Sequence, residues 1–167
     1  MAITIRRMRE ADYPSASRLL ALWNLAPVAP SAEVPSPERT ELVVENALVA
    51  LDGERLVGVR SFVQVSGTVA EGASFVIDPE YQGRGVGRLL SAAGLRDMYD
   101  KGIRVMRSEA DRPEMIEWLV RRGSRIVGTS PKRHCFGRAD VDHWTVLELS
   151  LEDGLAWAET VEIPPVR

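Results

Sequence analysis

The chain has 167 residues, of which 45% are hydrophobic and 27% are charged, with a formal net charge of −3. This composition predicts one globular domain with its own core and excludes a mainly disordered chain. No apolar run is long enough to cross a bilayer, and the acidic net charge argues against a general nucleic-acid binder. We therefore expect neither a membrane nor a nucleic acid as a partner. The single cysteine excludes an intrachain disulfide.

The charge is distributed unevenly along the chain. Residues 1–81 carry a net charge of −4, residues 82–138 carry +7 and residues 139–167 carry −6. A basic middle segment between acidic flanks indicates a local anionic ligand, although a solvated charged face would give the same pattern.

The first half of the chain predicts two helices and four strands. In chain order we expect a strand at 3–7, a helix from about residue 12, a proline-rich loop at 26–37, a short helix at 36–45 and three antiparallel strands at 47–51, 55–65 and 69–77. The turn Asp52-Gly53 between the first two of these three strands is typical of a hairpin. This arrangement is a meander.

The second half predicts alternating helices and strands. We expect a helix at 83–101, a strand at 103–106, a helix from 111 to Gly123 with Met115, Ile116, Leu119 and Val120 inward, strands at 125–128 and 144–151, and a loosely held tail at 154–167. A strand–helix–strand unit of this kind crosses over right-handed. The whole pattern predicts an α/β fold in one domain over residues 1–167, with a mixed sheet of about six to seven strands flanked by helices.

The most informative segment runs from 75 to 90 and reads Phe-Val-Ile-Asp-Pro-Glu-Tyr-Gln-Gly-Arg-Gly-Val-Gly-Arg-Leu-Leu. A strand ends, a loop with three alternating glycines follows, and a helix begins. Glycines let the backbone approach a ligand, and the N–H groups of such a loop and helix start form a cradle for phosphate. Arg84 and Arg88 can add charge-assisted contacts.

Three kinds of phosphate loop compete for this segment. A Walker A loop needs Gly-Lys-Ser/Thr, which the sequence lacks, and a dinucleotide-binding loop needs G-x-G-x-x-G, whereas the spacing here is Gly83-x-Gly85-x-Gly87. The pattern Gln82-x-x-Gly85-x-Gly87 after Val76-x-x-Pro79 resembles the acetyl-CoA loop of the GNAT superfamily of N-acetyltransferases. The order of elements along most of the chain also resembles that fold.

The resemblance implies a GNAT-like fold, acetyl-CoA as co-substrate and no metal. It assigns acetyl-CoA binding to Val76, Ile77, Gln82, Gly83, Arg84, Gly85, Val86, Gly87 and Arg88. In such proteins the strand before the loop splays from its neighbour, and its free backbone groups, here those of Val76 and Ile77, pair with the pantetheine arm. The pyrophosphate then lies on the N–H groups from Gln82 to Arg88.

A base is also implied, because the attacking amine must be neutral. In relatives this base is often a glutamate six residues before the position of Ile77, which is Glu71 here. Strand alternation places Glu71, Ala73, Phe75 and Ile77 on one face. A carboxylate that simply lies in water at the start of the strand fits the sequence equally well.

The sequence departs from the family pattern after the following strand. Where relatives carry Asn and then Tyr, this chain carries Arg112 and Leu119, and leucine cannot protonate a departing thiolate. Arg112 would either hold coenzyme A or cap its helix. His134 is the first candidate for the missing acid and Cys135 the second, in a loop that joins the last two strands. Water can also supply this proton.

A metal site is a weaker interpretation of the same loop. His134, Asp140, Asp142 and His143 are suitable ligand types, but their spacing matches no tight metal motif, so we expect none.

We therefore expect an N-acetyltransferase that moves an acetyl group from acetyl-CoA to a primary amine of a small molecule or a peptide. A non-catalytic acyl-CoA-binding module and a Rossmann-like nucleotide-binding protein are the alternatives. Because the N-terminus shows no export signal, we expect a cytoplasmic protein. A homodimer and the identity of the amine are left open.

Overall fold

The computed structural model describes residues 2–25, 42–132 and 136–166. Its helices are α1 (Tyr13–Ala21), α2 (Val86–Asp100), α3 (Pro113–Val120) and α4 (Leu151–Ala158), with short 3-10 helices η1 (Glu10–Asp12), η2 (Val44–Asn46) and η3 (Pro79–Tyr81). Its strands are β1 (Ile3–Arg7), β2 (Ala47–Asp52), β3 (Arg55–Gln64), β4 (Val69–Ile77), β5 (Val105–Ala110), β6 (Arg125–Pro131) and β7 (His143–Ser150). The expected loop at 26–37 and most of the expected helix at 36–45 lie outside the described residues.

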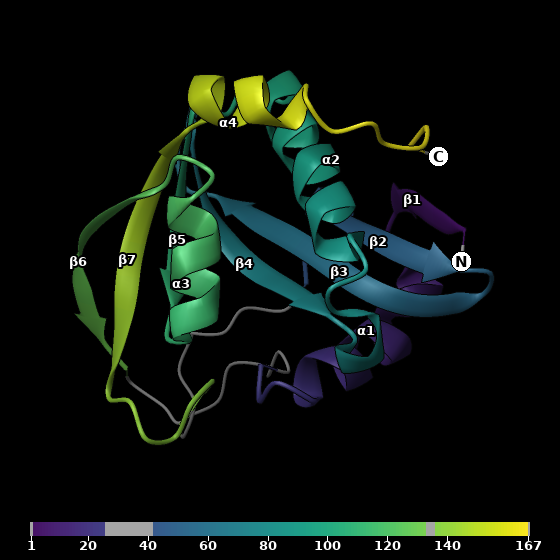
Figure 1. Cartoon of the computed structure of the whole chain (residues 1–167), viewed down its shortest axis with the longest axis horizontal. Coiled ribbons are helices and arrows are strands. Elements are labelled where there is room, and N and C mark those ends of the chain that lie inside the picture. Colours follow the sequence, from purple (N-terminus) through teal and green to yellow (C-terminus); the bar gives the residue numbers. More distant parts are fainter. Residues whose placement is uncertain (1, 26–41, 133–135, 167) are drawn as a thin grey trace.

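The described strands form one seven-stranded sheet in the order β1-β2-β3-β4-β5-β7-β6. Neighbouring strands are antiparallel except for β4 and β5, which are parallel and are connected through α2. The α/β class, the mixed sheet and the meander of β2, β3 and β4 are thereby confirmed (Figure 1).

Strand β5 begins and ends later than the sequence pattern predicted. The expected range was 103–106, whereas β5 runs from Val105 to Ala110. The reason is that its exposed face carries Arg107 and Glu109, which interrupt the apolar run by which the strand was identified.

Helix α3 turns three of the four expected side chains toward the sheet. Leu119 is buried against β5 and β7, and Met115 and Ile116 border the same cluster. Val120 is 44% exposed, so its expected inward orientation is wrong. Successive residues of a helix are separated by about 100° around the axis, and this rotation carries position 120 away from the sheet.

The parallel strands β4 and β5 lie side by side for only three residue pairs. Val69–Glu71 pairs with Val105–Arg107, and beyond these pairs β4 continues to Ile77 and β5 to Ala110 without pairing to each other. Strand β5 stays paired with β7, and both turn away from β4 (Figure 1). The two strands therefore form a V-shaped opening, with its apex at Glu71 and Arg107 and its mouth at Ile77.

A β-bulge interrupts β4 close to this apex. Ser61 of β3 pairs with Ser74, whereas the next residue, Phe62, pairs with Gly72, so that Ala73 is an extra residue of β4. A bulge of this kind shifts the alternation of side chains by one position.

The bulge reverses the face on which Glu71 lies. Phe62 packs against α2, so the next residue of β3, Val63, and its register partner Glu71 point to the opposite face. Phe75 is the register partner of Arg60, whose guanidinium contacts α2. The expectation that Glu71 lies on the same face as Phe75 is therefore wrong.

Helices cover both faces of the sheet. Helix α1 packs on β2, β3 and β4, where Ala16, Leu19 and Leu20 meet Val49, Val59 and Val76. Helix α2 packs on the other face, where Val86, Leu90 and Ala93 meet Leu48, Ala50 and Val57. Met106, which packs with α2, and Ala110, which packs with α3, lie four residues apart on β5 and share a face. Helix α3 therefore lies on the same side as α2, across the V-shaped opening from it.

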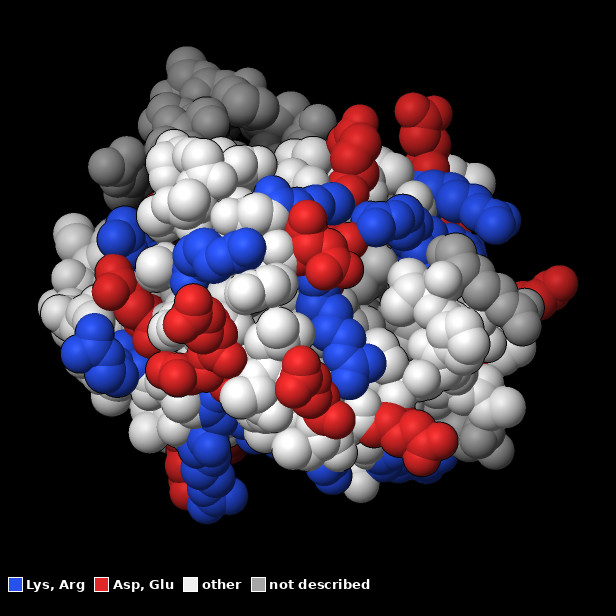
Figure 2. All heavy atoms as spheres, turned by 90° about the horizontal axis from the view of Figure 1, so that it is seen from above, with Lys and Arg blue, Asp and Glu red and all other residues white. Residues whose placement is uncertain are grey.

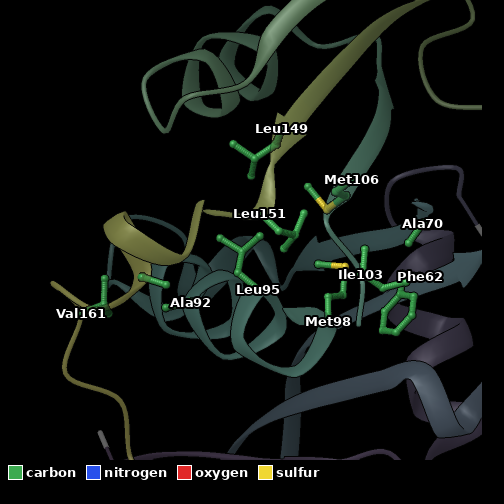
Figure 3. Close-up of a cluster of buried hydrophobic side chains, with 11 residues drawn as sticks. Phe62, Ala70, Ala92, Leu95, Met98, Ile103, Met106, Leu149, Leu151 and Val161 are labelled. Atoms are coloured by element: carbon green, nitrogen blue, oxygen red, sulfur yellow. The ribbon is translucent and has the colours of Figure 1, made fainter. Parts of the chain in front are cut away.

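The C-terminal segment is part of the core up to Val161. Ala158 is completely buried and Val161 is 4% exposed, and both belong to the cluster around Leu95 of α2 (Figure 3). Arg96 donates hydrogen bonds to the carbonyl oxygens of Ala158 at 2.7 Å and Val161 at 3.1 Å. The expectation of a loosely held tail from residue 154 is therefore wrong as far as Val161.

The uneven charge of the sequence does not produce one basic surface on the face that Figure 2 shows. Basic and acidic side chains are interspersed there. No helix within the described ranges is both long and apolar enough to span a membrane.

Truncation after Glu159 should lower the free energy of unfolding by about 2–4 kcal/mol, because it removes buried Val161 and one carbonyl acceptor of Arg96. Removal of residues 164–167 alone serves as the control and should change the free energy of unfolding by less than about 0.5 kcal/mol. Urea unfolding of the three chains measures both effects. Equal stability of the two truncated chains would show that the segment contributes nothing to the core.

Candidate functional site

Polar contacts fix the start of the loop that follows β4. The Asp78 carboxylate accepts the N–H of Glu80 at 2.9 Å and lies 2.8 Å from Arg55. The Tyr81 hydroxyl donates to Asp52 at 2.8 Å. Since Asp52 and Arg55 flank the turn between β2 and β3, this turn holds the loop in place.

Six successive N–H groups, those of residues 83–88, come next. In the described part of the chain none of them donates to a protein acceptor, and the first helical bond of α2 runs from the N–H of Leu89 to the carbonyl of Gly85 at 3.1 Å. Gly83 and Gly85 have φ angles of +71° and +83°, which residues other than glycine rarely adopt. Unpaired N–H groups at the start of a helix form an anion-binding site.

The edge of β4 that faces the V-shaped opening presents free backbone groups. The N–H of Asp78 donates to Val57 on β3, so Val76, two residues earlier, also directs its backbone groups to β3. Phe75 and Ile77 therefore direct theirs into the opening. The expectation for Ile77 agrees with this geometry, whereas that for Val76 is wrong, because its N–H and C=O belong to the β3–β4 ladder.

Aromatic and basic side chains border the opening on the side of α2 and α3. The rings of Phe75 and Trp118 are 5.6 Å apart, and the Arg122 guanidinium lies 3.6 Å above the Trp118 ring. Burial, and then the charge of Arg88, lowers the pKa of Arg122, whose buried Nε has no partner among the described residues. Two arginines that repel each other favour an anion between them.

A hollow of about 330 Å³ lies beside the loop. It is lined by Arg84, Gly85, Arg88, Leu89, Val161 and Glu162. Three of the loop residues that the sequence had assigned to the pyrophosphate, Arg84, Gly85 and Arg88, therefore line one hollow, together with the carboxylate Glu162.

Two exposed carboxylates lie on the α1 side of the sheet. Glu71 is at the apex of the opening, beside Arg107, which forms an ion pair with Glu148 at 3.0 Å. Glu109 lies two residues beyond Arg107 on the same face of β5, closer to the mouth. Glu109 was not predicted from the sequence, although the alternation of charged and buried residues in β5 was a usable signal.

The mouth of the opening is bordered by Trp23 and Arg112. The indole Nε1 of Trp23 donates to the carbonyl of Ile77, which β3 does not use, at 3.2 Å, and the Arg112 guanidinium lies 4.9 Å from the Trp23 ring centroid. Arg112 occupies the N-cap position of α3, but its side chain makes no capping hydrogen bond. Arg112 therefore begins α3 as its N-cap residue, as expected, but its side chain does not cap the helix.

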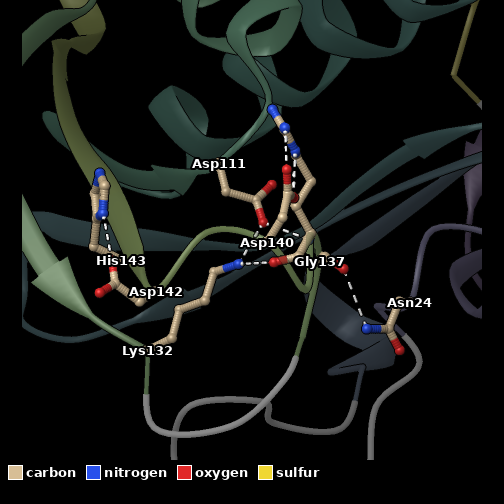
Figure 4. Close-up of polar contacts among 8 residues, drawn as sticks. Asn24, Asp111, Lys132, Gly137, Asp140, Asp142 and His143 are labelled. Carbon is tan, nitrogen blue, oxygen red and sulfur yellow. Dashed lines mark hydrogen bonds and ion pairs between the residues drawn. The ribbon is translucent and has the colours of Figure 1, made fainter.

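A buried ion pair anchors the connection between β6 and β7. Lys132 Nζ lies 2.7 Å from Asp111 Oδ2, and the two side chains are only 5% and 6% exposed. The same oxygen accepts the N–H of Arg138 at 2.7 Å, and Asn24, at the end of α1, exchanges hydrogen bonds with Gly137 (Figure 4). These contacts tie the connection to the mouth of the opening.

His134 and Cys135, the two candidate acids, lie outside the described residues. His143 Nδ1 lies 3.0 Å from Asp142 Oδ1 on the surface. Within the described ranges no three His, Cys, Asp or Glu side chains gather where they could hold a metal ion.

One family model matches residues 16–123, from α1 to the end of α3, and its description is "Acetyltransferase (GNAT) family". This range contains both the V-shaped opening and the glycine loop. The chain belongs to the GNAT family. The family is one of acetyltransferases, so the Rossmann-like alternative is wrong. No curated protein matches the sequence.

Solved GNAT structures share the whole fold. The chain matches Ard1 from Thermoplasma volcanium with a TM-score of 0.71 and 20% identity, over 90% of this chain and 98% of that one. It matches yncA, a putative acetyltransferase from Salmonella typhimurium solved with acetyl-CoA, with a TM-score of 0.67 and 20% identity, over 90% and 95%. It matches the ribosomal-protein-S18-alanine N-acetyltransferase from Escherichia coli with a TM-score of 0.66 and 18% identity, over 90% and 94%.

The residues of this GNAT chain suit acetyl-CoA. Unpaired N–H groups and arginines suit the pyrophosphate, and the free edge of β4 offers donors and acceptors for the amides of the pantetheine arm. At the position where the family pattern has tyrosine, this chain has Leu119, on the buried face of α3 against Leu147. No hydroxyl is available there.

Substitution of Gly85 tests the loop. Gly85→Glu should weaken coenzyme A binding by about 100-fold or more, because the new carboxylate faces the pyrophosphate. Gly85→Ala is the matched control: a Cβ at this position meets no atom within 4 Å, so the variant carries the same backbone strain without the charge. Titration calorimetry with coenzyme A measures both. If Gly85→Glu binds as tightly as Gly85→Ala, the pyrophosphate does not lie on this loop.

Removal of one partner of the buried ion pair should destabilise the protein strongly. We expect Asp111→Ala to lower the free energy of unfolding by about 3–5 kcal/mol, because Lys132 then remains buried without its counter-charge. Asp111→Ala combined with Lys132→Met should restore part of this loss. Asp140→Ala breaks the exposed pair with Arg138 and should lower it by less than about 1 kcal/mol. Denaturant unfolding that ranks Asp140→Ala level with Asp111→Ala would contradict an anchoring role.

Proposed function

We propose that this GNAT protein transfers the acetyl group of acetyl-CoA to a primary amine by direct attack, with both substrates bound together. The observation that carries the proposal is the V-shaped opening between β4 and β5, which leads to six unpaired N–H groups at its mouth. A thioester and an amine can meet there from opposite faces of the sheet.

Binding follows from the chemistry of each part of the opening. The pyrophosphate lies on the N–H groups of residues 83–88, and the pantetheine arm pairs with the backbone of Phe75 and Ile77. This pairing directs the thioester toward the apex. A main-chain N–H of the open strand then polarises its carbonyl and stabilises the oxyanion as it forms.

The amine reaches the thioester from the α1 side. A free alkylammonium has a pKa near 10, so it must lose a proton before it attacks. Glu71 and Glu109 lie on this side, and because both are exposed, either would take the proton directly or through water. We assign the base to Glu71, which lies at the apex, where the thioester is expected.

The departing thiolate needs no acid at the Leu119 position. A thiol with a pKa near 8.5 is a fair leaving group and can take its proton from water. His134 is the other proton source that the sequence offers, followed by Cys135.

One specific observation favours a second candidate function, a non-catalytic acyl-CoA-binding module. A buried apolar side chain, Leu119, replaces the hydroxyl of the family pattern. Such a module would bind acetyl-CoA without turning it over.

A thiol-release assay separates the two functions. The protein is incubated with acetyl-CoA and a panel of amines that contains polyamines, amino acids, aminoglycosides and peptides with free N-termini or lysines. Amine-dependent release of coenzyme A, with acetylated amine found by mass spectrometry, supports the enzyme. Tight binding of acetyl-CoA with no release for any class of amine supports the module.

The base can be tested with two matched carboxamide variants. Glu71→Gln should lower turnover by roughly 10- to 1000-fold at neutral pH, with partial recovery at high pH, where the amine is already neutral. Glu109→Gln removes the neighbouring carboxylate of the same face and should change turnover less than about threefold. Rates from pH 6 to 10 measure both. The reverse ranking would assign the base to Glu109.

A further inference from the structure

Arg60 is a buried cation in the middle of β3. Its side chain lies on the α2 side and is 8% exposed. Nη1 donates to the hydroxyl of Ser91 at 2.6 Å and to the carbonyl of the same residue at 3.3 Å. Nη2 reaches Met106 on β5, with its sulfur 3.2 Å away.

This guanidinium has no counter-charge among the described residues. No carboxylate within the described ranges forms an ion pair with Arg60, and a thioether is only a weak acceptor. Burial lowers its pKa to about 10, so it is protonated at neutral pH. An unpaired charge costs more free energy in a protein interior than a well-packed apolar side chain, and an arginine is therefore a poor choice for packing alone.

The guanidinium lies above the apex of the V-shaped opening. Arg60 is the register partner of Phe75, and the sulfur it contacts belongs to Met106, the parallel partner of Ala70. The Arg60 side chain therefore crosses the α2 side of β4 at a position between Phe75 and Ala70. Gly72 lies there and offers no side chain, and a Cβ on it would be 3.6 Å from the Ser108 hydroxyl of β5.

We infer that Arg60 is a catalytic residue that stabilises the coenzyme A thiolate as it departs. In this complex the thiolate takes the place of the Met106 sulfur as the contact of Arg60 Nη2. This inference rests on the proposed function. The substrate enters with its phosphates at the mouth, so its sulfur is the end nearest the apex. When the amine attacks, the C–N bond forms, the C–S bond breaks and the sulfur keeps the electron pair. Arg60 stays protonated, and the thiolate later takes a proton from water.

Arg60 therefore explains how the reaction proceeds with leucine at position 119. A fixed positive charge lowers the pKa of a thiol and makes it a better leaving group without donating a proton. The groups that face the guanidinium are Ser91 and Gly94 of α2, Phe75 of β4 and Met106 of β5, and none of them titrates near neutral pH.

The test compares the binding of coenzyme A with that of desulfo-coenzyme A, which lacks only the thiol, from pH 7 to 9. If Arg60 lowers the pKa of the bound thiol by about one unit, the affinity ratio of the two ligands rises about sixfold over this range, because the thiolate binds more tightly than the thiol. Titration calorimetry gives the ratio. Arg60 keeps its charge throughout, because its pKa is about 10.

Three variants complete the test. Arg60→Met removes the charge with little change in volume, and its affinity ratio should stay flat or fall with pH, whereas Arg60→Lys should keep part of the rise. Arg104→Met, which removes an arginine that stacks on Tyr99 at the surface, should behave as wild type. In the acetyl-transfer reaction we expect Arg60→Met to lower kcat about tenfold or more, with less effect on the KM for the amine.

The outcomes separate this inference from the proposed function. If the affinity ratio of coenzyme A to desulfo-coenzyme A does not change with pH in the wild-type protein, the role of Arg60 is overturned and the proposal of acetyl transfer still stands. This measurement does not depend on any variant being folded. An equal rise in Arg60→Met overturns the role of Arg60 as well. If wild type binds neither ligand, the coenzyme A site itself is wrong and both proposals fall. A thermal melt of each variant confirms that it is folded.

Discussion

The parting of β4 from β5 after three residue pairs is the constraint on which the site depends. A strand in the middle of a sheet normally satisfies its backbone groups on both edges, and an unpaired buried N–H or C=O costs free energy. Here β4 pairs with β3 along its length and leaves its other edge open toward the mouth. The Trp23 indole satisfies one of the freed carbonyls, that of Ile77, and the N–H of Ile77 and the backbone groups of Phe75 are available to a ligand.

The helices keep this opening in place. Helix α2 packs on the β4 half of the sheet and reaches Met106 of β5 and Leu149 of β7, whereas α3 packs on Ala110 of β5 and Leu147 of β7. The buried pair of Asp111 and Lys132 then holds the β6–β7 connection at the mouth. Positive charge on the α2 side, from Arg60 and Arg122, lacks carboxylate partners among the described residues, which suits a polyanionic co-substrate.

Much of the fold could be predicted from local signals. The hairpin turn at Asp52-Gly53, the apolar strands around it and the glycine loop after β4 follow from turn chemistry and periodicity, and the resemblance of the loop indicated the co-substrate. The face of Glu71 could not be predicted, because a bulge depends on the pairing of two strands and leaves no mark in the sequence of one. The burial of Val161 was missed for a similar reason, since it depends on a distant helix.

In the candidate site, too, contiguous residues could be predicted from the sequence, whereas residues that only the fold brings together could not. Residues 83–88 are contiguous, so their role as a cradle could be read from the sequence. Arg60, Trp23 and Glu109 come from three different elements, and only the register of β3, β4 and β5 and the end of α1 bring them to the opening. No periodicity in the sequence indicates that these three side chains lie beside the same opening.

Amide hydrogen exchange with and without acetyl-CoA tests most directly whether the V-shaped opening is the co-substrate site. We expect the amides of Phe75, Ile77 and residues 83–88 to exchange more slowly when acetyl-CoA binds, because each gains an acceptor. The amides of the edge strand β6 should not change. Binding that leaves the amides of Phe75 and Ile77 unprotected, or that protects residues away from the opening instead, would contradict it.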